Sequence, residues 1–119
     1  MNNSLYAAAP ITQEYTVIRE VERGQGRVVQ DGDTITVNYV AYQTAKSGGY
    51  IIDERKGSDS FTFKLGSGEV EESFSHAILG GDTSQPMREG GKRRFVIPEN
   101  LSSFGTDVHF DVHLVKIHD

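Results

Sequence analysis

The stretch TITVNYVAY, residues 34–42, alternates apolar side chains with mostly polar ones. Its members Ile35, Val37, Tyr39 and Ala41 share one face, because successive side chains of a strand point to opposite sides. This period of two predicts a half-buried β-strand. Extended patterns on either side of it predict four more strands and one short extended piece: residues 15–21, 60–65, 92–97 and 108–114, and the piece at 50–53.

One segment between these strands has a helical period instead. In residues 69–79, Val70, Phe74, Ala77 and Ile78 fall at i, i+4, i+7 and i+8 and form a single apolar stripe. Acidic residues fill the first turn, where the helix dipole favours them, and a pair of glycines follows the last turn. We therefore predict an α+β domain, with about five antiparallel strands in one sheet and a single helix on one face.

The chain has 119 residues, which is enough for one domain and not for two. Residues 1–12 are polar or small and lack periodicity, so we expect a flexible tail followed by a single domain at 13–119. The N-terminus has neither a basic start nor a long apolar run and is not a signal peptide as it stands. We expect a cytoplasmic location, while the run AAAP at 7–10 leaves a trimmed export signal open.

The composition excludes several classes of function. With 12 Lys and Arg against 17 Asp and Glu, the chain carries a net charge of −5 and is a poor candidate for binding nucleic acid. No cysteine is present, which excludes disulfides, a thiol nucleophile and cysteine-ligated zinc. No apolar run approaches the ~20 residues that cross a membrane. The basic run at 92–94 lies in a predicted strand, and we expect it to be solvent-exposed.

Two groups of residues could carry chemistry. His109, Asp111 and His113 alternate along the last predicted strand and share one face, where they could bind a metal. A solvated strand face explains the same spacing without a metal, and we favour that interpretation. The second group is aromatic, and such residues form a core more often than a pocket: Tyr39, Phe61, Phe63, Phe74, Phe104 and Phe110.

Several short motifs occur in one order between about Tyr15 and His118. They are GQGR at 24–27, VNY at 37–39, ID at 52–53, FTFKLG at 61–66, EV at 69–70, MREGGKR at 87–93, VIP at 96–98, FG at 104–105 and FDVHL at 110–114. Their order and spacing resemble the FKBP-type peptidyl-prolyl cis-trans isomerases over nearly the whole domain. The resemblance implies an FKBP-like fold, a sheet of about five antiparallel strands wrapped around one short helix.

The resemblance also implies a proline-binding pocket whose residues carry over position by position. Tyr39, Asp53 and Phe110 take the catalytic positions. At the position of Glu71, the backbone N–H of family members donates a hydrogen bond to ligand carbonyls. The implied substrate-binding residues are Ile52, Phe61, Phe63, Val70, Glu71, Phe74 and Phe104.

This sequence departs from the family pattern at several of these places. Phe74 stands where the family usually has Trp, and Phe104 stands where a Tyr hydroxyl usually donates to a ligand. Ile52 replaces an aromatic wall. The long loop that normally precedes the last strand is essentially missing, whereas the segment at 80–84 is longer than usual.

By this resemblance we expect an isomerase that acts on X–Pro bonds in peptides and proteins and assists folding. It would use an apolar pocket, with no covalent catalysis, cofactor or metal. We expect a monomer whose partners are proline-containing peptides or proteins, with macrolide ligands bound at reduced affinity and no nucleic acid or membrane bound. The departures keep a second hypothesis open, a catalytically weak module that binds peptides or partners or acts as a chaperone.

Overall fold

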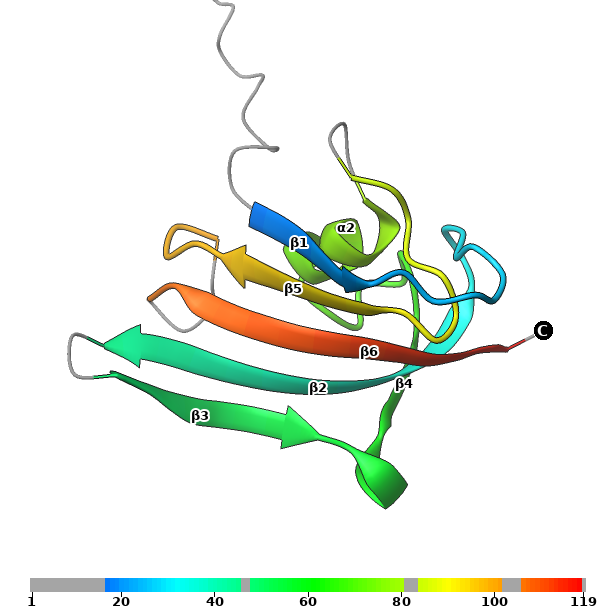
Figure 1. Cartoon of the computed structure of the whole chain (residues 1–119). Helices are drawn as coiled ribbons and strands as arrows, with labels where there is room; N and C mark the ends of the chain where they lie inside the picture. The colour runs from blue at the N-terminus through cyan, green and yellow to red at the C-terminus, as the bar shows by residue number, and fades with distance from the viewer. Residues whose placement is uncertain (1–16, 46–47, 81–83, 102–105, 119) are drawn as a thin grey trace, which may run out of the picture.

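The computed structural model describes residues 17–45, 48–80, 84–101 and 106–118. These residues form one six-stranded antiparallel sheet and a single α-helix, α2 (Glu72–Leu79), which lies against one face of the sheet (Figure 1). The strands are β1 (Val17–Glu22), β2 (Thr34–Ala45), β3 (Gly48–Arg55), β4 (Phe61–Lys64), β5 (Lys92–Ile97) and β6 (Val108–His118). The α+β class predicted from the sequence is confirmed. No helix in this described part of the chain is long and apolar enough to span a membrane.

The sheet has the order β1-β5-β6-β2-β3, and β4 pairs with the remaining part of β2. Residues 39–45 of β2 pair with β3 and residues 34–37 pair with β4, so β3 and β4 follow one another along the same side of β2. The short 3-10 helix η1 (Gly57–Asp59) separates them. The sequence analysis counts five strands, and β3 is the sixth, because the extended piece at 50–53 belongs to an eight-residue strand.

The apolar face of the sheet forms the core together with α2. Ile35, Val37 and Ala41 of β2 are buried, as the alternation predicts, and Tyr39 is partly buried at the edge of the same cluster. The last strand is longer than predicted and runs to His118. The helix, β5 and β6 contribute further core residues: Phe74, Ala77, Ile78, Phe95, Val112 and Leu114.

The helix begins at Glu72, later than the predicted start at Glu69. A local turn competes with it: Ser67 Oγ donates to the Lys64 carbonyl oxygen at 2.7 Å, and the Lys64 N–H donates to Glu69 Oε1 at 3.1 Å. Side-chain bonds of this kind give the backbone an alternative to a helical turn. Val70 therefore precedes the helix, and it still packs against the core.

The expected exposure of the basic run at 92–94 is wrong for Arg93, which is only 1% exposed. The alternation of β5 turns the middle residue of this run towards the core. There its guanidinium donates to the carbonyl oxygens of Ala77 at 2.7 Å and Gln85 at 2.5 Å, and it pairs with Glu20 at 2.6 Å. These partners make burial of the charge tolerable, and they hold the C-terminal end of α2 against the sheet.

Candidate functional site

An open pocket of about 250 Å³ lies where the sheet meets the segment that leads into α2. Strands β2, β3, β4 and β6 supply one side of it, and residues 69–71 with the first turn of α2 supply the other. It is lined by Tyr39, Ala41, Asp53, Phe61, Glu69, Val70, Glu71, Phe74 and Phe110. The pocket therefore combines an aromatic base with carboxylates at its rim.

Phe74 is the centre of the aromatic base. Its ring centroid lies 5.1 Å from that of Phe110, 5.6 Å from that of Phe95 and 5.9 Å from that of Tyr39. All three contacts are edge-to-face, an arrangement that aromatic rings favour. The helical period places Phe74 towards the sheet, so its ring is 5% exposed and offers only its pocket side to a ligand.

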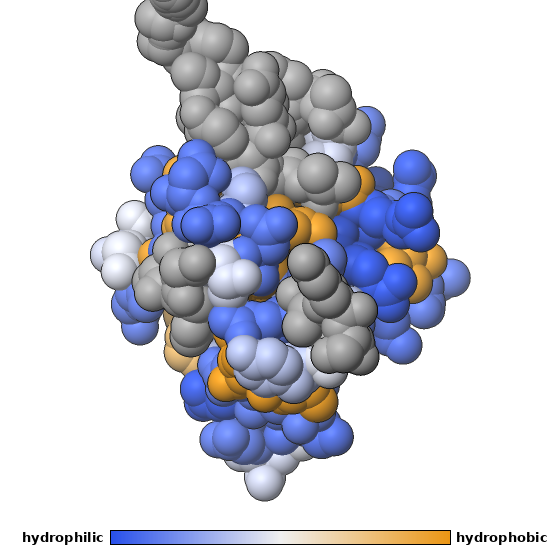
Figure 2. All heavy atoms as spheres, turned by 90° about the vertical axis from the view of Figure 1, so that its left-hand side faces the viewer, coloured by the Kyte–Doolittle hydropathy of each residue, from blue (hydrophilic) through white to orange (hydrophobic). Residues whose placement is uncertain are grey.

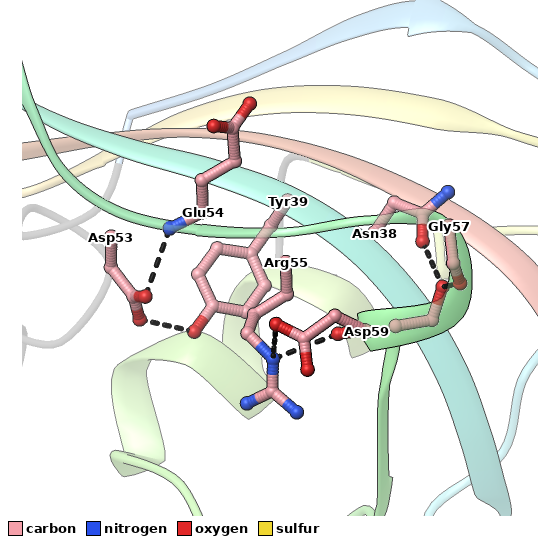
Figure 3. Close-up of polar contacts among 8 residues, drawn as sticks. Asn38, Tyr39, Asp53, Glu54, Arg55, Gly57 and Asp59 are labelled. Carbon is pink, nitrogen blue, oxygen red and sulfur yellow. Dashed lines mark hydrogen bonds and ion pairs between the residues drawn. The ribbon is translucent and has the colours of Figure 1, made fainter.

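One polar pair lines the pocket beside this base. The Tyr39 hydroxyl donates to Asp53 Oδ2 at 2.5 Å, and the Glu54 N–H donates to Asp53 Oδ1 at 2.8 Å (Figure 3). Strand pairing explains the contact, because Asp53 lies opposite Ala41, two residues along the same face of β2 from Tyr39. Burial, followed by the hydrogen bond to Asp53, raises the pKa of Tyr39 to about 12. The neutral phenol is therefore a fixed donor to the carboxylate.

Arg55 packs against Phe61, which lines one side of the pocket. Its guanidinium carbon lies 5.0 Å from the centroid of the Phe61 ring, in a cation–π contact. Arg55 Nε also donates to the Asp59 carbonyl oxygen at 2.8 Å, and the Ser60 hydroxyl bonds to Asn38 (Figure 3). The sequence analysis does not identify Arg55, because its contact with Phe61 depends on the turn at η1, which has no clear sequence pattern.

The structure brings together seven of the ten residues implied by the resemblance. They are Tyr39, Asp53, Phe61, Val70, Glu71, Phe74 and Phe110. Phe63 lies deeper, opposite Ile35, where it is 2% exposed and stacks on Phe61 at 5.1 Å. Ile52 packs against the core instead of lining the pocket, and Phe104 lies outside the described residues. The pocket also uses Glu69 and Ala41, and the alternation at 34–42 already places Ala41 on this face.

The strand face that carries His109, Asp111 and His113 has other contacts. In the described part of the chain, no group of three or more His, Asp or Glu residues is placed to hold a metal ion. Asp111 pairs with Arg94 at 2.7 Å, and the His109 ring stacks on Tyr42 with centroids 5.2 Å apart. Asp111 and His109 are thus engaged with neighbouring side chains of the same face.

Most of the chain matches one known protein family. Residues 25–115 match the family described as FKBP-type peptidyl-prolyl cis-trans isomerase. The chain belongs to this family. FK506-binding protein 4 of Aspergillus fumigatus is 33% identical over 109 residues, which cover 84% of this chain and 20% of that protein. The FK506-binding protein of Streptomyces anulatus is 28% identical over 85 residues, which cover 71% of this chain and 63% of that protein.

The match with this FKBP-type chain therefore covers only 14% to 20% of the length of its fungal relatives. Among solved structures, AtFKBP13 has a TM-score of 0.73 at 25% identity, covering 87% of this chain and 93% of that chain. FkpA from Escherichia coli has a TM-score of 0.59 at 25% identity, covering 89% of this chain and 49% of that chain. The fold is that of the family.

Proposed function

We propose that this chain is a peptidyl-prolyl cis-trans isomerase that acts on X–Pro bonds in peptides and proteins and assists their folding. The main support is the Tyr39–Asp53 pair, which stands beside an apolar base built from Phe74 and Phe110. A pocket of about 250 Å³ is at the small end for ligand sites and suits one prolyl ring. Membership of the family points to the same chemistry.

Isomerisation needs no bond to be broken. The barrier of ~18–20 kcal/mol arises because the amide loses its resonance when it is twisted. At ~20 kcal/mol the uncatalysed rate is on the order of 10⁻² per second, so a modest reduction of the barrier is useful. The prolyl ring would rest on Phe74 between Tyr39 and Phe110. Excluding water from the amide there would weaken the hydrogen bonds that favour its planar form.

Tyr39 and Asp53 would fix the geometry of the bound peptide. The Tyr39 hydroxyl, whose pKa is raised to about 12, is protonated at neutral pH and remains a donor. Asp53 would act electrostatically on the twisted amide and would not remove a proton. This mechanism requires neither a nucleophile nor a metal.

A second candidate function is a binding or chaperone module with little catalysis. It is favoured by Phe74 at the base of the pocket, a smaller ring than the Trp that the resemblance leads us to expect. Only Thr106 and Asp107 separate Gly105 from β6, so the long loop that the resemblance leads us to expect there is missing from the sequence and cannot cover a bound peptide. Both candidates use the same pocket and differ in how strongly it stabilises the twisted amide.

The deciding experiment measures isomerisation of a short X–Pro peptide by the wild type, Asp53→Ala and Glu54→Gln. Glu54 is a matched control, because its side chain pairs with Lys56 and does not line the pocket. We expect weak turnover by the wild type and by Glu54→Gln, and on the order of a tenfold loss in Asp53→Ala, the value of one charge-assisted hydrogen bond. A folded wild type with no rate above background would support the binding module instead.

A further inference from the structure

The face that carries the pocket continues along the β2–β3 hairpin. Ala41 and Asp53, which line the pocket, lie opposite each other across the two strands. The next pair on that face is Gln43 with Tyr50, and β6 continues it with Val108 opposite Gln43. A bulge between Ala41 and Tyr42 accommodates the extra residue of β3 and keeps this pair in line with the pocket.

Tyr50 is therefore placed one step beyond the pocket. Ala41 and Gln43 are two residues apart on β2, which corresponds to about 7 Å along a strand, on the same face. Tyr50 lies across from Gln43 and is 59% exposed, so more than half of the residue is accessible to solvent. Figure 2 faces this end of the molecule and shows apolar side chains at the surface among polar ones.

The neighbouring residue Ile51 has a different position. It is 58% exposed, nearly the same as Tyr50, but it lies opposite Tyr42, whose ring stacks on His109. Tyr42 follows the buried Ala41 and points to the other face of the sheet. Tyr50 and Ile51 thus have nearly equal exposed fractions on opposite faces of the sheet, and only Tyr50 is on the face of the pocket.

We propose that Tyr50 and Gln43 form a second subsite, which binds an apolar or aromatic side chain of the client near its proline. This inference rests on the proposed function, since the proline in the pocket sets the register of the peptide. A tyrosine ring offers a rigid apolar surface with a polar end, and the Gln43 amide can donate to or accept from a peptide group. The substrate class is an extended segment with an apolar residue two positions from its proline.

The spacing determines which client residue is bound. An extended peptide advances about 3.3 Å per residue, so a step of about 7 Å places the subsite two residues from the proline. Burial of about 55 Å² of apolar surface at about 25 cal/mol per Å² corresponds to roughly tenfold in affinity. A single aromatic residue on the client is large enough to bury that area.

The test uses two pairs of extended peptides. Within each pair the peptides differ only in Phe or Ser, placed two residues before the proline in one pair and two residues after it in the other. Dissociation constants and kcat/KM are measured for the wild type, Tyr50→Ser, Tyr50→Phe and Ile51→Ser. We expect the wild type to prefer Phe roughly tenfold in one pair. Tyr50→Ser should reduce this ratio to about one, while Tyr50→Phe and Ile51→Ser should keep it.

Equal values for Phe and Ser in both pairs would overturn the subsite, and so would equal loss of the preference in Ile51→Ser and Tyr50→Ser. Failure of the proposed function gives a different result. A wild type that turns over no peptide is not an isomerase under these conditions, and the dissociation constants alone then decide whether Tyr50 selects the client.

Discussion

The two ends of α2 are held in opposite ways. At the C-terminal end, the buried Arg93 donates to the carbonyl oxygens of Ala77 and Ile78, which satisfies groups that a helix end leaves without partners in the helix. At the N-terminal end, the first residue outside the helix, Glu71, makes no capping hydrogen bond with its side chain. Residues 69–71 line the pocket instead.

This difference separates stability from binding within the short segment from Glu69 to Leu79. Ala77 and Ile78, near the closed end, are 0% exposed, whereas Val70 and Glu71, at the open end, are only partly buried. Substitutions at the closed end should unfold the protein. Substitutions at the open end should change ligand binding more than stability.

The largest effect is expected at the closed end, for Arg93→Ala. The change leaves buried carbonyl oxygens and Glu20 without their partner, which costs about 3–5 kcal/mol of the free energy of unfolding. In a domain of this size the Tm should fall by more than about 10 °C. Thermal and urea unfolding followed by circular dichroism measure both quantities.

Arg94→Ala is the matched control for this prediction. Arg94 is the next residue of β5, and its pair with Asp111 is exposed, with 49% and 41% of the two side chains accessible. Exposed pairs of this kind contribute about 0–1 kcal/mol. Equal loss of stability in the two variants would contradict the assignment of Arg93 as the residue that holds the helix end.

Phe110→Ala tests a residue that belongs to both regions. Its ring packs on Phe74 and Phe95, it is 9% exposed, and it also lines the pocket. We expect a loss of about 3 kcal/mol in the free energy of unfolding, at the lower end for buried Phe, together with lower isomerase activity. Activity must be measured at a temperature where the variant remains folded. Full activity in the folded variant would remove Phe110 from the pocket wall.

Macrolide binding tests only the open end of α2, where residues 69–71 line the pocket. We expect such a ligand to bind at least about a hundredfold more weakly than to a family member with a full pocket, which corresponds to ~2.7 kcal/mol. Phe74 gives a smaller base than Trp, and the long loop that the resemblance leads us to expect before β6 is missing from the sequence. Each 100 Å² of apolar surface left uncovered costs about 2.5 kcal/mol. Nanomolar affinity in a calorimetric titration would contradict this argument.

The elements of the fold could be predicted because their periods are clear, while their exact pairing could not. The alternation at 34–42 correctly places Ile35, Val37 and Ala41 in the core. Nothing in the sequence marks the bulge after Ala41 that brings Asp53 into register. The charge of Arg93 predicts an exposed side chain, whereas the alternation of β5 places this residue on the buried face. Arg93 is buried because Glu20, 73 residues away in the sequence, provides a partner for its charge.

The candidate site depended on resemblance more than on physical pattern. Tyr39 and Asp53 are 14 residues apart, and only the pairing of β2 with β3 brings them together. The alternation of β4 places Phe61 and Phe63 on the same face, yet only Phe61 lines the pocket. Phe63 is buried against Phe74 of α2, with ring centroids 5.9 Å apart, and this contact between distant elements cannot be derived from alternation.

The smallest expected effect concerns the proton of Tyr39. Burial and the bond to Asp53 raise the folded pKa to about 12 from the ordinary value of 10.0, so the neutral phenol is favoured by folding. The corresponding stabilisation is fully present below about pH 10 and is lost as the pH rises through about 12. The difference in phenolate absorbance between the wild type and Tyr39→Phe should therefore have a midpoint near pH 12. Asp53→Asn should lower that midpoint without abolishing the shift, because burial is the larger cause. A midpoint near 10 in the folded wild type would show that the open end of the pocket is wetter than the contacts of Tyr39 imply.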